Sequence, residues 1–417
     1  MLHFLYSLFF RLALPLVLLR LWWQGRNNRE VRRDWRQRLG FVPVSDQPVI
    51  WVHAVSVGET IAAGPLVKAL LERRPDVPIL MTAMTATGAA QAKAMFGDRV
   101  RYAYSPYDTP GSVRRFVRRV RPQALAIMET ELWPNMIQQV SERNCPIFLV
   151  NARLSARSAR GYQRIDSLVR SLLRRLTWIA AQADEDAHRF LVIGARPDSV
   201  SVTGSIKFDV DITDETRERA RVLRQQFNGR PVWIAASTHE GEDEQLLAAH
   251  QRLLAALPQA LMVIVPRHPE RFDSVASLVE RQGLSLVRRS SEEQVGSAQV
   301  YLGDSMGELL VLYGASDVAF VGGSLIERGG HNPLEPAGWG IPVISGPHVF
   351  NFETIYKQLE EGHGLVYAGD AGALAENLIH LLSDEAAAEA SGQAALAVVE
   401  ANRGALNRVV EGILSRL

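Results

Sequence analysis

Residues 318–344 read VAFVGGSLIERGGHNPLEPAGWGIPVI. An apolar run at 318–321 leads into two glycines, a second glycine pair precedes a helix-forming segment, and another apolar run follows at 342–344. Glycines placed between a strand and a helix expose backbone N–H groups to a phosphate. The stretch therefore predicts a nucleotide-binding α/β unit.

Short apolar runs separated by helical patterns continue upstream through most of the chain. One series comprises residues 49–55, 79–82, 124–128, 147–150 and 178–181, followed by a last short strand and linker at 202–205. A second series comprises 232–236, 261–265, 285–288, 318–321 and 342–344. Strands that alternate with helices form parallel sheets, which bind ligands at the carboxyl ends of their strands. We therefore expect two Rossmann-like α/β domains, residues 26–205 and 229–390, joined by a linker at 206–228.

Composition and charge limit the possible partners. The chain has 417 residues, which suits two domains with attachments, and its one cysteine, Cys145, excludes internal disulfides. Residues 1–205 hold 29 Lys and Arg against 16 Asp and Glu, whereas the remaining residues hold 17 against 29. We expect the first half to face an anionic partner, the alternative being ordinary solvated helix faces.

The N-terminal segment LHFLYSLFFRLALPLVLLRLWW, residues 2–23, is long enough to span a bilayer. Arg11 and Arg20 interrupt it, so an interfacial helix fits as well as a spanning one. A basic run follows, which consists of Arg26, Arg29, Arg32, Arg33, Arg36 and Arg38 against Glu30 and Asp34. This pattern predicts a membrane anchor at residues 1–25 with the next domain on the cytoplasmic side. The alternative is a buried first helix of a soluble domain.

Acidic residues follow two expected strands of the first domain. Glu59 stands near the start of a helix, where it can act as a general base or simply compensate the helix N-terminus. Glu129 and Glu131 follow a buried strand, and they either serve the site or form an N-cap cluster for the helix after Pro134.

Arginine is dense in two further stretches of the first domain. They contain Arg114, Arg115, Arg118, Arg119 and Arg121, then Arg153, Arg157, Arg160, Arg164, Arg170, Arg174 and Arg175. Guanidinium groups suit phosphates, either on an acceptor or on lipid headgroups. Nucleic acid is not expected, because no aromatic stacking surface accompanies the charges.

In the second domain, three features suit a nucleotide. Arg267 and His268 follow one strand, and Glu335 lies in the first turn of a helix, where it could accept hydrogen bonds from ribose hydroxyls. The sequence Asp-Val-Asp at 209–211 superficially matches a metal motif, but it lies in the linker, and no His/Cys cluster has ligand spacing. We therefore expect no metal site.

Six motifs occur in order along the chain. They are SVGE at 56–59, METELWPN at 128–135, NARLS at 151–155, PRHPERF at 266–272, FVGGSL at 320–325 and GGHNPLE at 329–335. Together with the N-terminal segment they resemble the 3-deoxy-D-manno-octulosonic acid (Kdo) transferases of Gram-negative bacteria, which are GT-B glycosyltransferases, over nearly the whole chain.

The resemblance implies inverting transfer of Kdo from CMP-Kdo to a lipid A precursor, lipid IVA, in lipopolysaccharide biosynthesis. The implied location is the cytoplasmic side of the inner membrane, at its lipid surface, with no cofactor and no metal. The domain at 26–205 would bind the acceptor, the domain at 229–390 would bind the CMP-sugar, and residues 391–417 would form a helix that packs back on the first domain.

The resemblance also assigns roles to residues. Glu59 is the implied general base that deprotonates the acceptor hydroxyl. The implied CMP contacts are Arg267, His268, Met306, Gly307, Glu308, Asn332, Pro333, Leu334 and Glu335. Because Kdo carries a carboxylate, we also expect a cation near it, either Lys207 or Arg328.

Three other functions compete with this interpretation. A nucleotide-sugar epimerase can share the fold but needs no membrane anchor. A transferase of the same fold could use a UDP-sugar instead. A membrane-tethered nucleotide-sugar sensor would tolerate the loss of Glu59 without consequence.

Overall fold

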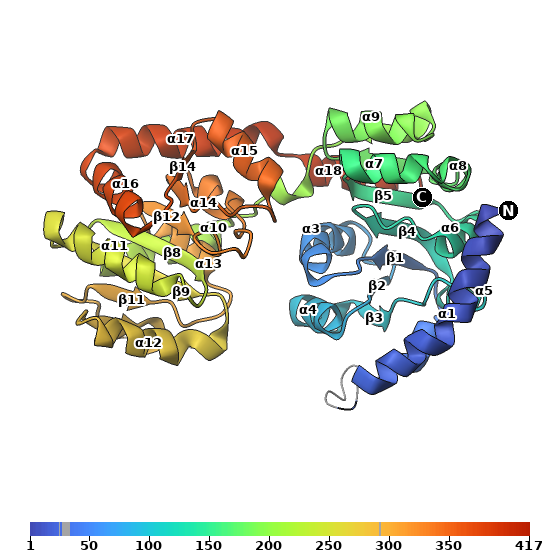
Figure 1. The fold of residues 1–417 in the computed structure, drawn as a ribbon, viewed down its shortest axis with the longest axis horizontal. Coiled ribbons are helices and arrows are strands. Elements are labelled where there is room, and N and C mark those ends of the chain that lie inside the picture. The colour runs from blue at the N-terminus through green and yellow to red at the C-terminus, as the bar shows by residue number, and fades with distance from the viewer. Residues whose placement is uncertain (25, 27–33, 292) are drawn as a thin grey trace. The chain divides into compact units, whose positions relative to one another are not determined.

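The structure is a computed structural model that describes residues 1–24, 26, 34–291 and 293–417. Arg29, Glu30, Arg32 and Arg33 of the predicted basic run lie outside the described residues. The chain forms two compact units (Figure 1). Unit 1 comprises Met1–Lys207 and Arg403–Leu417, and unit 2 comprises Phe208–Asn402.

Unit 1 is built on a seven-stranded sheet in which every pairing is parallel. Its strands are β1 (Val49–His53), β2 (Ile79–Ala83), β3 (Arg101–Tyr104), β4 (Pro122–Met128), β5 (Ile147–Ala152), β6 (Trp178–Ala181) and β7 (Val200–Val202). The strand order is β3-β2-β1-β4-β5-β6-β7, so the chain reverses its direction of travel between β1 and β4. Ligands of such sheets bind at the carboxyl ends beside this reversal, and Glu59 and Glu129 follow these two strands.

The helices of unit 1 begin at side chains suited to that position. They are α1 (Leu2–Gln24), α3 (Val57–Arg73), α4 (Ala86–Phe96), α5 (Pro110–Val120), α6 (Pro134–Ser141), α7 (Ala156–Gln163), α8 (Asp166–Leu173), α9 (Asp184–Val192) and α18 (Ala405–Leu414), with short 3-10 turns at Trp35–Leu39, Gly97–Arg99, Pro197–Ser199 and Ile206–Phe208. Ser56, Thr85 and Thr109 each cap the helix that follows them. Hydroxyl caps supply acceptors for N–H groups that have no partner inside the helix.

Helix α1 is not a core helix. Among the described residues, Leu2–Trp23 is the one helical segment long and apolar enough to cross a membrane, and 6% of its most apolar window is buried. Phe4, Phe9, Leu12 and Leu16 are between 65% and 70% exposed. The alternative of a buried first helix is therefore wrong, because these side chains lie outside the unit 1 core.

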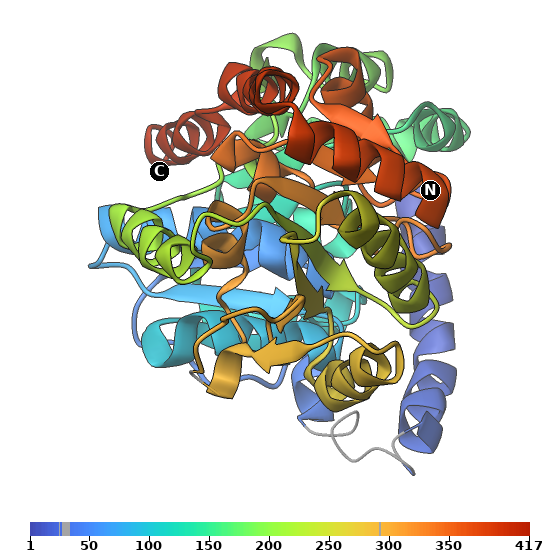
Figure 2. The ribbon, with the colours of Figure 1, turned by 90° about the vertical axis from the view of Figure 1, so that its left-hand side faces the viewer.

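Unit 2 repeats the same architecture. Its parallel strands are β8 (Val232–Thr238), β9 (Leu261–Pro266), β10 (Leu286–Arg288), β11 (Val300–Leu302), β12 (Val318–Val321), β13 (Val343–Ser345) and β14 (Leu365–Tyr367), in the order β10-β11-β9-β8-β12-β13-β14. Its helices are α10 (Asp214–Gln226), α11 (Asp243–Ala256), α12 (Phe272–Arg281), α13 (Leu309–Gly314), α14 (Leu334–Trp339), α15 (Glu353–Glu361), α16 (Ala371–Ser383) and α17 (Glu385–Asn402), with 3-10 turns at Pro269–Arg271 and Arg289–Ser291. Helices cover both faces of this sheet (Figure 2). The expectation of two Rossmann-like units is confirmed.

The unit boundaries differ in two places from the expected domains. Residues 206–228, expected as a linker, include α10, which packs against α13 inside unit 2. Residues 391–402, expected with the C-terminal helix, belong to α17 of unit 2, and the chain returns to unit 1 from Arg403. There α18 packs against α3, and Arg73 pairs with Glu411 across the two helices.

Three strands were not predicted from the sequence, namely β3, β11 and β14. β3 carries exposed Arg101 and half-exposed Tyr102 at the sheet edge, so its pattern is not apolar. β11 and β14 have three residues each, too few for a periodic pattern. Pairing with neighbouring strands, rather than local composition, makes these segments extended.

Candidate functional site

Glu59 is the third residue of α3, directly beyond the carboxyl end of β1. Its Oε2 accepts a hydrogen bond from the Val55 N–H at 2.9 Å, and its Oε1 accepts one from the Ser56 hydroxyl at 2.9 Å. The Ser56 hydroxyl in turn accepts a hydrogen bond from the Glu59 N–H. This reciprocal pair is similar to a capping box, except that the carboxylate accepts the N–H of Val55 instead of that of the N-cap residue Ser56, so the structural role foreseen for Glu59 is present. The same bonds hold the carboxylate in one place at the strand end.

The environment of Glu59 also prepares it for proton transfer. Burial raises the pKa of Glu59 to about 6, against the lowering effect of the hydrogen bonds from Val55 and Ser56, and the charges of Glu131 and Glu129 add to the rise. A carboxylate with a pKa near 6 is still mostly ionised at neutral pH, yet it is a stronger base than an exposed one. The arrangement suits a general base.

Glu129 and Glu131 do not cap α6. The N–H groups of Asn135 and Met136 at the start of α6 instead donate to Asp108, at 3.0 and 2.8 Å. Glu129 pairs with Lys207, its Oε1 lying 3.4 Å from Nζ, and Glu131 accepts a hydrogen bond from the Trp133 indole at 2.8 Å. The N-cap explanation is therefore wrong for this pair, and both carboxylates remain close enough to Glu59 to raise its pKa.

Glu129 also has an unusual backbone. Its φ is 57°, in the left-handed region that non-glycine residues rarely adopt. Its N–H is nevertheless fixed by a hydrogen bond of 2.9 Å to the Val150 carbonyl on the neighbouring strand. Such strain, held by the surrounding sheet, is concentrated at functional sites in proteins.

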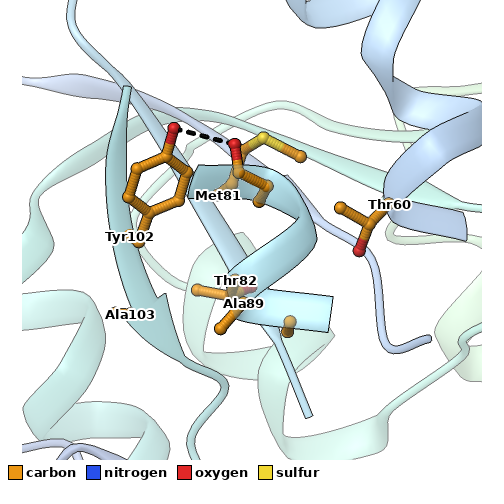
Figure 3. A pocket seen from close by; sticks show the side chains of 8 residues that line it. Thr60, Met81, Thr82, Ala89, Tyr102 and Ala103 are labelled. Carbon is orange, nitrogen blue, oxygen red and sulfur yellow. Dashed lines mark hydrogen bonds between the residues drawn. The ribbon is translucent and has the colours of Figure 1, made fainter. Parts of the chain in front are cut away.

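A small pocket lies beside this region, between α3, α4 and the strands β2 and β3 (Figure 3). Thr60, Met81 and Tyr102 line it, and the Tyr102 hydroxyl donates to the Ala92 carbonyl at 3.1 Å. Its volume of about 10 Å³ is at the lower limit for a single water molecule. The pocket is therefore too small for a sugar.

In unit 2 the glycine loop at 322–325 is held by a buried acid that the sequence did not single out. Glu242 has no solvent exposure, and its carboxylate accepts hydrogen bonds from the N–H groups of Gly323, Ser324 and Leu325 at 2.8, 3.1 and 3.1 Å. A fourth bond comes from the His239 N–H at 3.3 Å. These amides are thus already occupied by a protein carboxylate.

Backbone N–H groups of the second glycine segment, residues 329–331, are also bound within the protein. The Gly330 N–H donates to the Gly323 carbonyl at 2.9 Å, and the His331 N–H donates to the Gly322 carbonyl at 3.1 Å. The expectation that the glycines present free N–H groups to a phosphate is therefore wrong for Gly322, Gly323 and Gly330. Glycines at these positions instead let two loops and one carboxylate pack closely.

Three histidines gather above this loop. His239 follows β8, His268 follows β9, and His331 follows the second glycine pair. The Nε2 atoms of His239 and His331 are 2.8 Å apart, and their rings are nearly parallel, with an interplanar angle of 11° and centroids 5.1 Å apart. His268 lies edge-on to His239, with ring centroids 5.6 Å apart.

The predicted CMP contacts occupy different environments. Arg267 and His268 are exposed at the carboxyl end of β9, whereas Glu335 is half-buried and accepts a hydrogen bond from Asn332 at 3.4 Å. Burial raises the pKa of Glu335, although the nearby Arg267 opposes the rise. Pro333 and Leu334 are buried at the start of α14 and position these two polar side chains.

Met306, Gly307 and Glu308 lie before α13, a helix of six residues. Met306 and Gly307 are exposed, and Gly307 has a φ of 79°. Glu308 is bound by Arg289 and Arg219, which together with Ser305 lower its pKa to about 2. Glu308 is therefore a fixed anion whose charge is already compensated by protein.

The two cations expected near the sugar carboxylate lie in different units and have different surroundings. Lys207 forms the ion pair with Glu129 in unit 1. Arg328 is exposed in the loop between the two glycine pairs of unit 2, and its charge helps lower the pKa of His239. Arg328 is thus the one that belongs to the histidine region.

Comparison with known proteins identifies the family. Residues 33–210 match the family described as 3-deoxy-D-manno-octulosonic-acid transferase, and residues 238–397 match glycosyl transferases group 1. A 3-deoxy-D-manno-octulosonic acid transferase of Haemophilus influenzae is 42% identical over 98% of this chain and 97% of its own. The chain belongs to the Kdo transferase family.

Other relatives agree with this family and fold. The corresponding transferase of Bordetella pertussis is 38% identical over 98% of each chain. A solved UDP-GlcNAc 2-epimerase of Neisseria meningitidis bound to UDP-GlcNAc superposes with a TM-score of 0.57, covering 88% of this chain and all of that one, at 14% identity. At that identity the likeness concerns the fold alone, and it confirms the two-domain GT-B architecture. Family membership makes the chain a glycosyltransferase of lipopolysaccharide biosynthesis and argues against the epimerase alternative.

Proposed function

We propose that this chain transfers Kdo, with inversion, from CMP-Kdo to a hydroxyl of lipid IVA, a phosphorylated lipid A precursor. Membership in the Kdo transferase family supports the transferred sugar. The nucleotide, the acceptor and the stereochemistry are what the resemblance to this family implies. UDP-sugars are the competing donors.

The observation that carries the proposal is the state of Glu59. It is a buried carboxylate at a strand end, fixed by two hydrogen bonds, with a pKa raised to about 6. In the proposed step, Glu59 takes the proton from the acceptor hydroxyl while the hydroxyl oxygen bonds to the anomeric carbon of Kdo. The bond from that carbon to the phosphate oxygen breaks, and its electron pair leaves with CMP.

The donor side of the proposal rests on unit 2. Arg267 and His268 are exposed cationic or polar groups beyond β9, which suits a nucleoside monophosphate. Asn332 and Glu335 form a hydrogen-bonded pair that suits ribose hydroxyls. A single phosphate needs less positive charge than a diphosphate, in keeping with the acidic balance of the second half of the chain.

The membrane side of the proposal rests on α1 and the arginines of α7 and α8. Apolar side chains of α1 are exposed, and α1 packs against α8. Arg157, Arg160 and Arg174 are exposed on or next to these helices. An apolar helix beside exposed cations suits the anionic inner surface of a membrane, so we place the protein on the cytoplasmic side of the inner membrane.

The test uses the full chain in detergent with lipid IVA and freshly generated CMP-Kdo. Mass spectrometry of the lipid is expected to show the addition of one or more Kdo units, and NMR of the product is expected to show the anomeric configuration opposite to that of the donor. Parallel reactions with UDP-sugars serve as the control. An unmodified lipid with CMP-Kdo, together with a product from a UDP-sugar, would overturn the proposal.

A further inference from the structure

The paired histidines of unit 2 have no role in the proposed CMP contacts. His239 and His331 come from segments 92 residues apart, yet their Nε2 atoms share a hydrogen bond of 2.8 Å. Both side chains are half-buried, and Gly323 lies directly beneath them. A Cβ at position 323 would come within 3.2 Å of the His331 ring and 3.5 Å of the His239 ring. The glycine therefore leaves room for the pair.

An anion at this edge of the sheet cannot use the backbone of the glycine loop. Glu242 accepts the N–H groups of Gly323, Ser324 and Leu325, and the loops use the N–H groups of Gly330 and His331 between themselves. The side chains above the loop offer further donors. Among these, the histidine pair is the one held in a fixed geometry by a mutual hydrogen bond.

The mutual hydrogen bond determines which donors the pair can offer. One Nε2 carries a proton and the other accepts it, so in the neutral pair one Nδ1 carries a proton and the other Nδ1 has a lone pair. Neither Nδ1 bonds to another residue in the part of the chain that the structure describes. Addition of one proton would make both Nδ1 atoms donors and would give the pair a positive charge.

Burial, supported by the surrounding charges, explains why the pair is neutral without a ligand. Burial is the main cause that lowers the pKa of His239 to about 4, and His268, Arg328, Arg271 and Arg267 add to it. Burial also lowers the pKa of His331 to about 3, and His239, Arg267 and His268 contribute to the lowering. An anion placed among these cations would reverse this effect and favour the protonated pair.

The fixed negative charges near the pair do not provide that anion. Glu242 lies below the loop and is fully engaged by backbone N–H groups. Asp243, at the start of α11, is bound by Arg271. Arg267 and Arg328 are exposed cations that act on His239, and both favour an anionic ligand.

We propose that the His239–His331 pair is a subsite for an anionic group of the donor, a phosphate or a carboxylate, and that the pair takes up one proton from solvent when this group binds. The inference rests on the proposed function, because that function supplies a donor with both groups. The two residues would hold the anion through imidazole N–H groups, while the glycine loop and Glu242 position them.

The test is isothermal titration calorimetry of the full chain in detergent at pH 7.5, with His239→Gln, His331→Gln and the wild type. His380→Gln, at an exposed position in the last turn of α16, is the matched control. CMP, cytidine and inorganic phosphate are the probes. Each titration is repeated in two buffers of different ionisation enthalpy, which measures the number of protons taken up.

The wild type and His380→Gln are expected to take up a proton with CMP. Each site variant is expected to lose this uptake and to bind CMP about tenfold or more weakly, because a charge-assisted hydrogen bond is lost. Cytidine affinity should stay the same in all four proteins, which also establishes that the variants are folded. If CMP affinity is unchanged but the KM for CMP-Kdo rises, the bound group is the sugar carboxylate.

Unchanged CMP affinity, proton uptake and donor KM in both variants would overturn the subsite. These results do not depend on sugar transfer, because CMP binding is measured without an acceptor. If the chain binds UDP rather than CMP, the assignment of CMP-Kdo as the donor is wrong. The UDP affinities of the same variants are then measured. A loss of UDP affinity would then support the subsite, and equal affinity would contradict it.

Discussion

The N–H of Gly323 donates a hydrogen bond of 2.8 Å to the carboxylate of Glu242, a residue 81 positions earlier in the chain. Ser324 and Leu325 donate to the same carboxylate, which has no exposure to solvent. The glycine loop, a motif typical of anion binding, thus binds the carboxylate of Glu242 from the same chain. The glycine loop acts as a support for the side chains above it.

Replacement of Glu242 by Gln is expected to destabilise unit 2. Each carboxylate oxygen accepts two N–H groups, so the amide NH₂ of glutamine would face two donors and leave them unsatisfied. We expect a loss of about 1–3 kcal/mol in the free energy of unfolding, measured by denaturant titration. Glu240→Gln, at an exposed position two residues earlier, should change stability little. Equal stability of the two variants would contradict this role of Glu242.

Replacement of Gly323 by Ala should weaken CMP binding, whereas the matched replacement of Gly283 by Ala should leave CMP binding unchanged. The residue has a φ of 70°, and its new Cβ would displace the His331 ring. Gly283→Ala is the matched control, because Gly283 has a φ of 76° and its Cβ would meet no atom within 4 Å. Both variants carry the left-handed backbone cost of about 1–2 kcal/mol. A similar CMP affinity in both would show that Gly323 does not serve the histidine pair.

The pH dependence of transfer should reflect Glu59. A general base must be ionised, so kcat/KM for the acceptor is expected to rise with pH and to level off above the pKa of about 6. The kinetic profile between pH 5 and 8 checks this. A profile without an inflection near 6 would assign the limiting proton transfer to another group.

Glu59 also makes the stability of the fold depend on pH, and this stability falls with rising pH whereas the transfer rate rises. The pKa of Glu59 is raised from 4.5 to about 6 in the folded chain, so the folded state holds this proton more tightly than the unfolded state. The resulting stabilisation is complete below pH 4.5 and is lost as pH rises to 6. Glu59→Gln should therefore be at least as stable as the wild type at pH 7, since the side-chain carbonyl of glutamine can still accept the Val55 N–H.

Helix α1 is expected to lie along unit 1 with both of its ends on the same side of a membrane. The Tyr6 hydroxyl donates to the buried carboxylate of Asp108 at 2.9 Å, and the Ser7 hydroxyl donates to Asn135 at 2.8 Å. These bonds tie the N-terminal part of α1 to a folded polar unit. The spanning arrangement left open by the sequence would separate them.

Single cysteines at positions 2 and 23 test this arrangement in sealed vesicles with an impermeant thiol reagent. Cys145 is buried and its pKa is raised to about 12, so it should not react. Both new cysteines are expected to react from the side that carries units 1 and 2. Reaction of position 2 from the opposite side alone would establish a spanning helix.

The sequence predicted the α/β architecture because most strands are continuous apolar runs, such as β8 and β12, that pair in a buried parallel sheet. It also placed Glu59 correctly at the start of a helix, because SVGE combines a hydroxyl cap with an acid three residues later. Local patterns of this kind can be read from neighbouring residues alone.

Contacts between distant segments could not be read in this way. The bonds from Glu242 to residues 323–325 and the pairing of His239 with His331 depend on how β8 and β12 lie side by side. The sequence HEG at 239–241, directly before Glu242, was visible as polar residues after a strand. Nothing local indicated that one of these acids would fill the glycine loop.

The central claim is that Glu59 removes the acceptor proton while unit 2 binds the donor. The most direct test compares the wild type with Glu59→Gln for Kdo transfer to lipid IVA and, in parallel, for CMP affinity. We predict that transfer falls by a factor of about 10²–10⁴, the usual contribution of a general base, while CMP affinity and thermal stability are unchanged. Transfer by Glu59→Gln within a few fold of the wild-type rate would contradict the account.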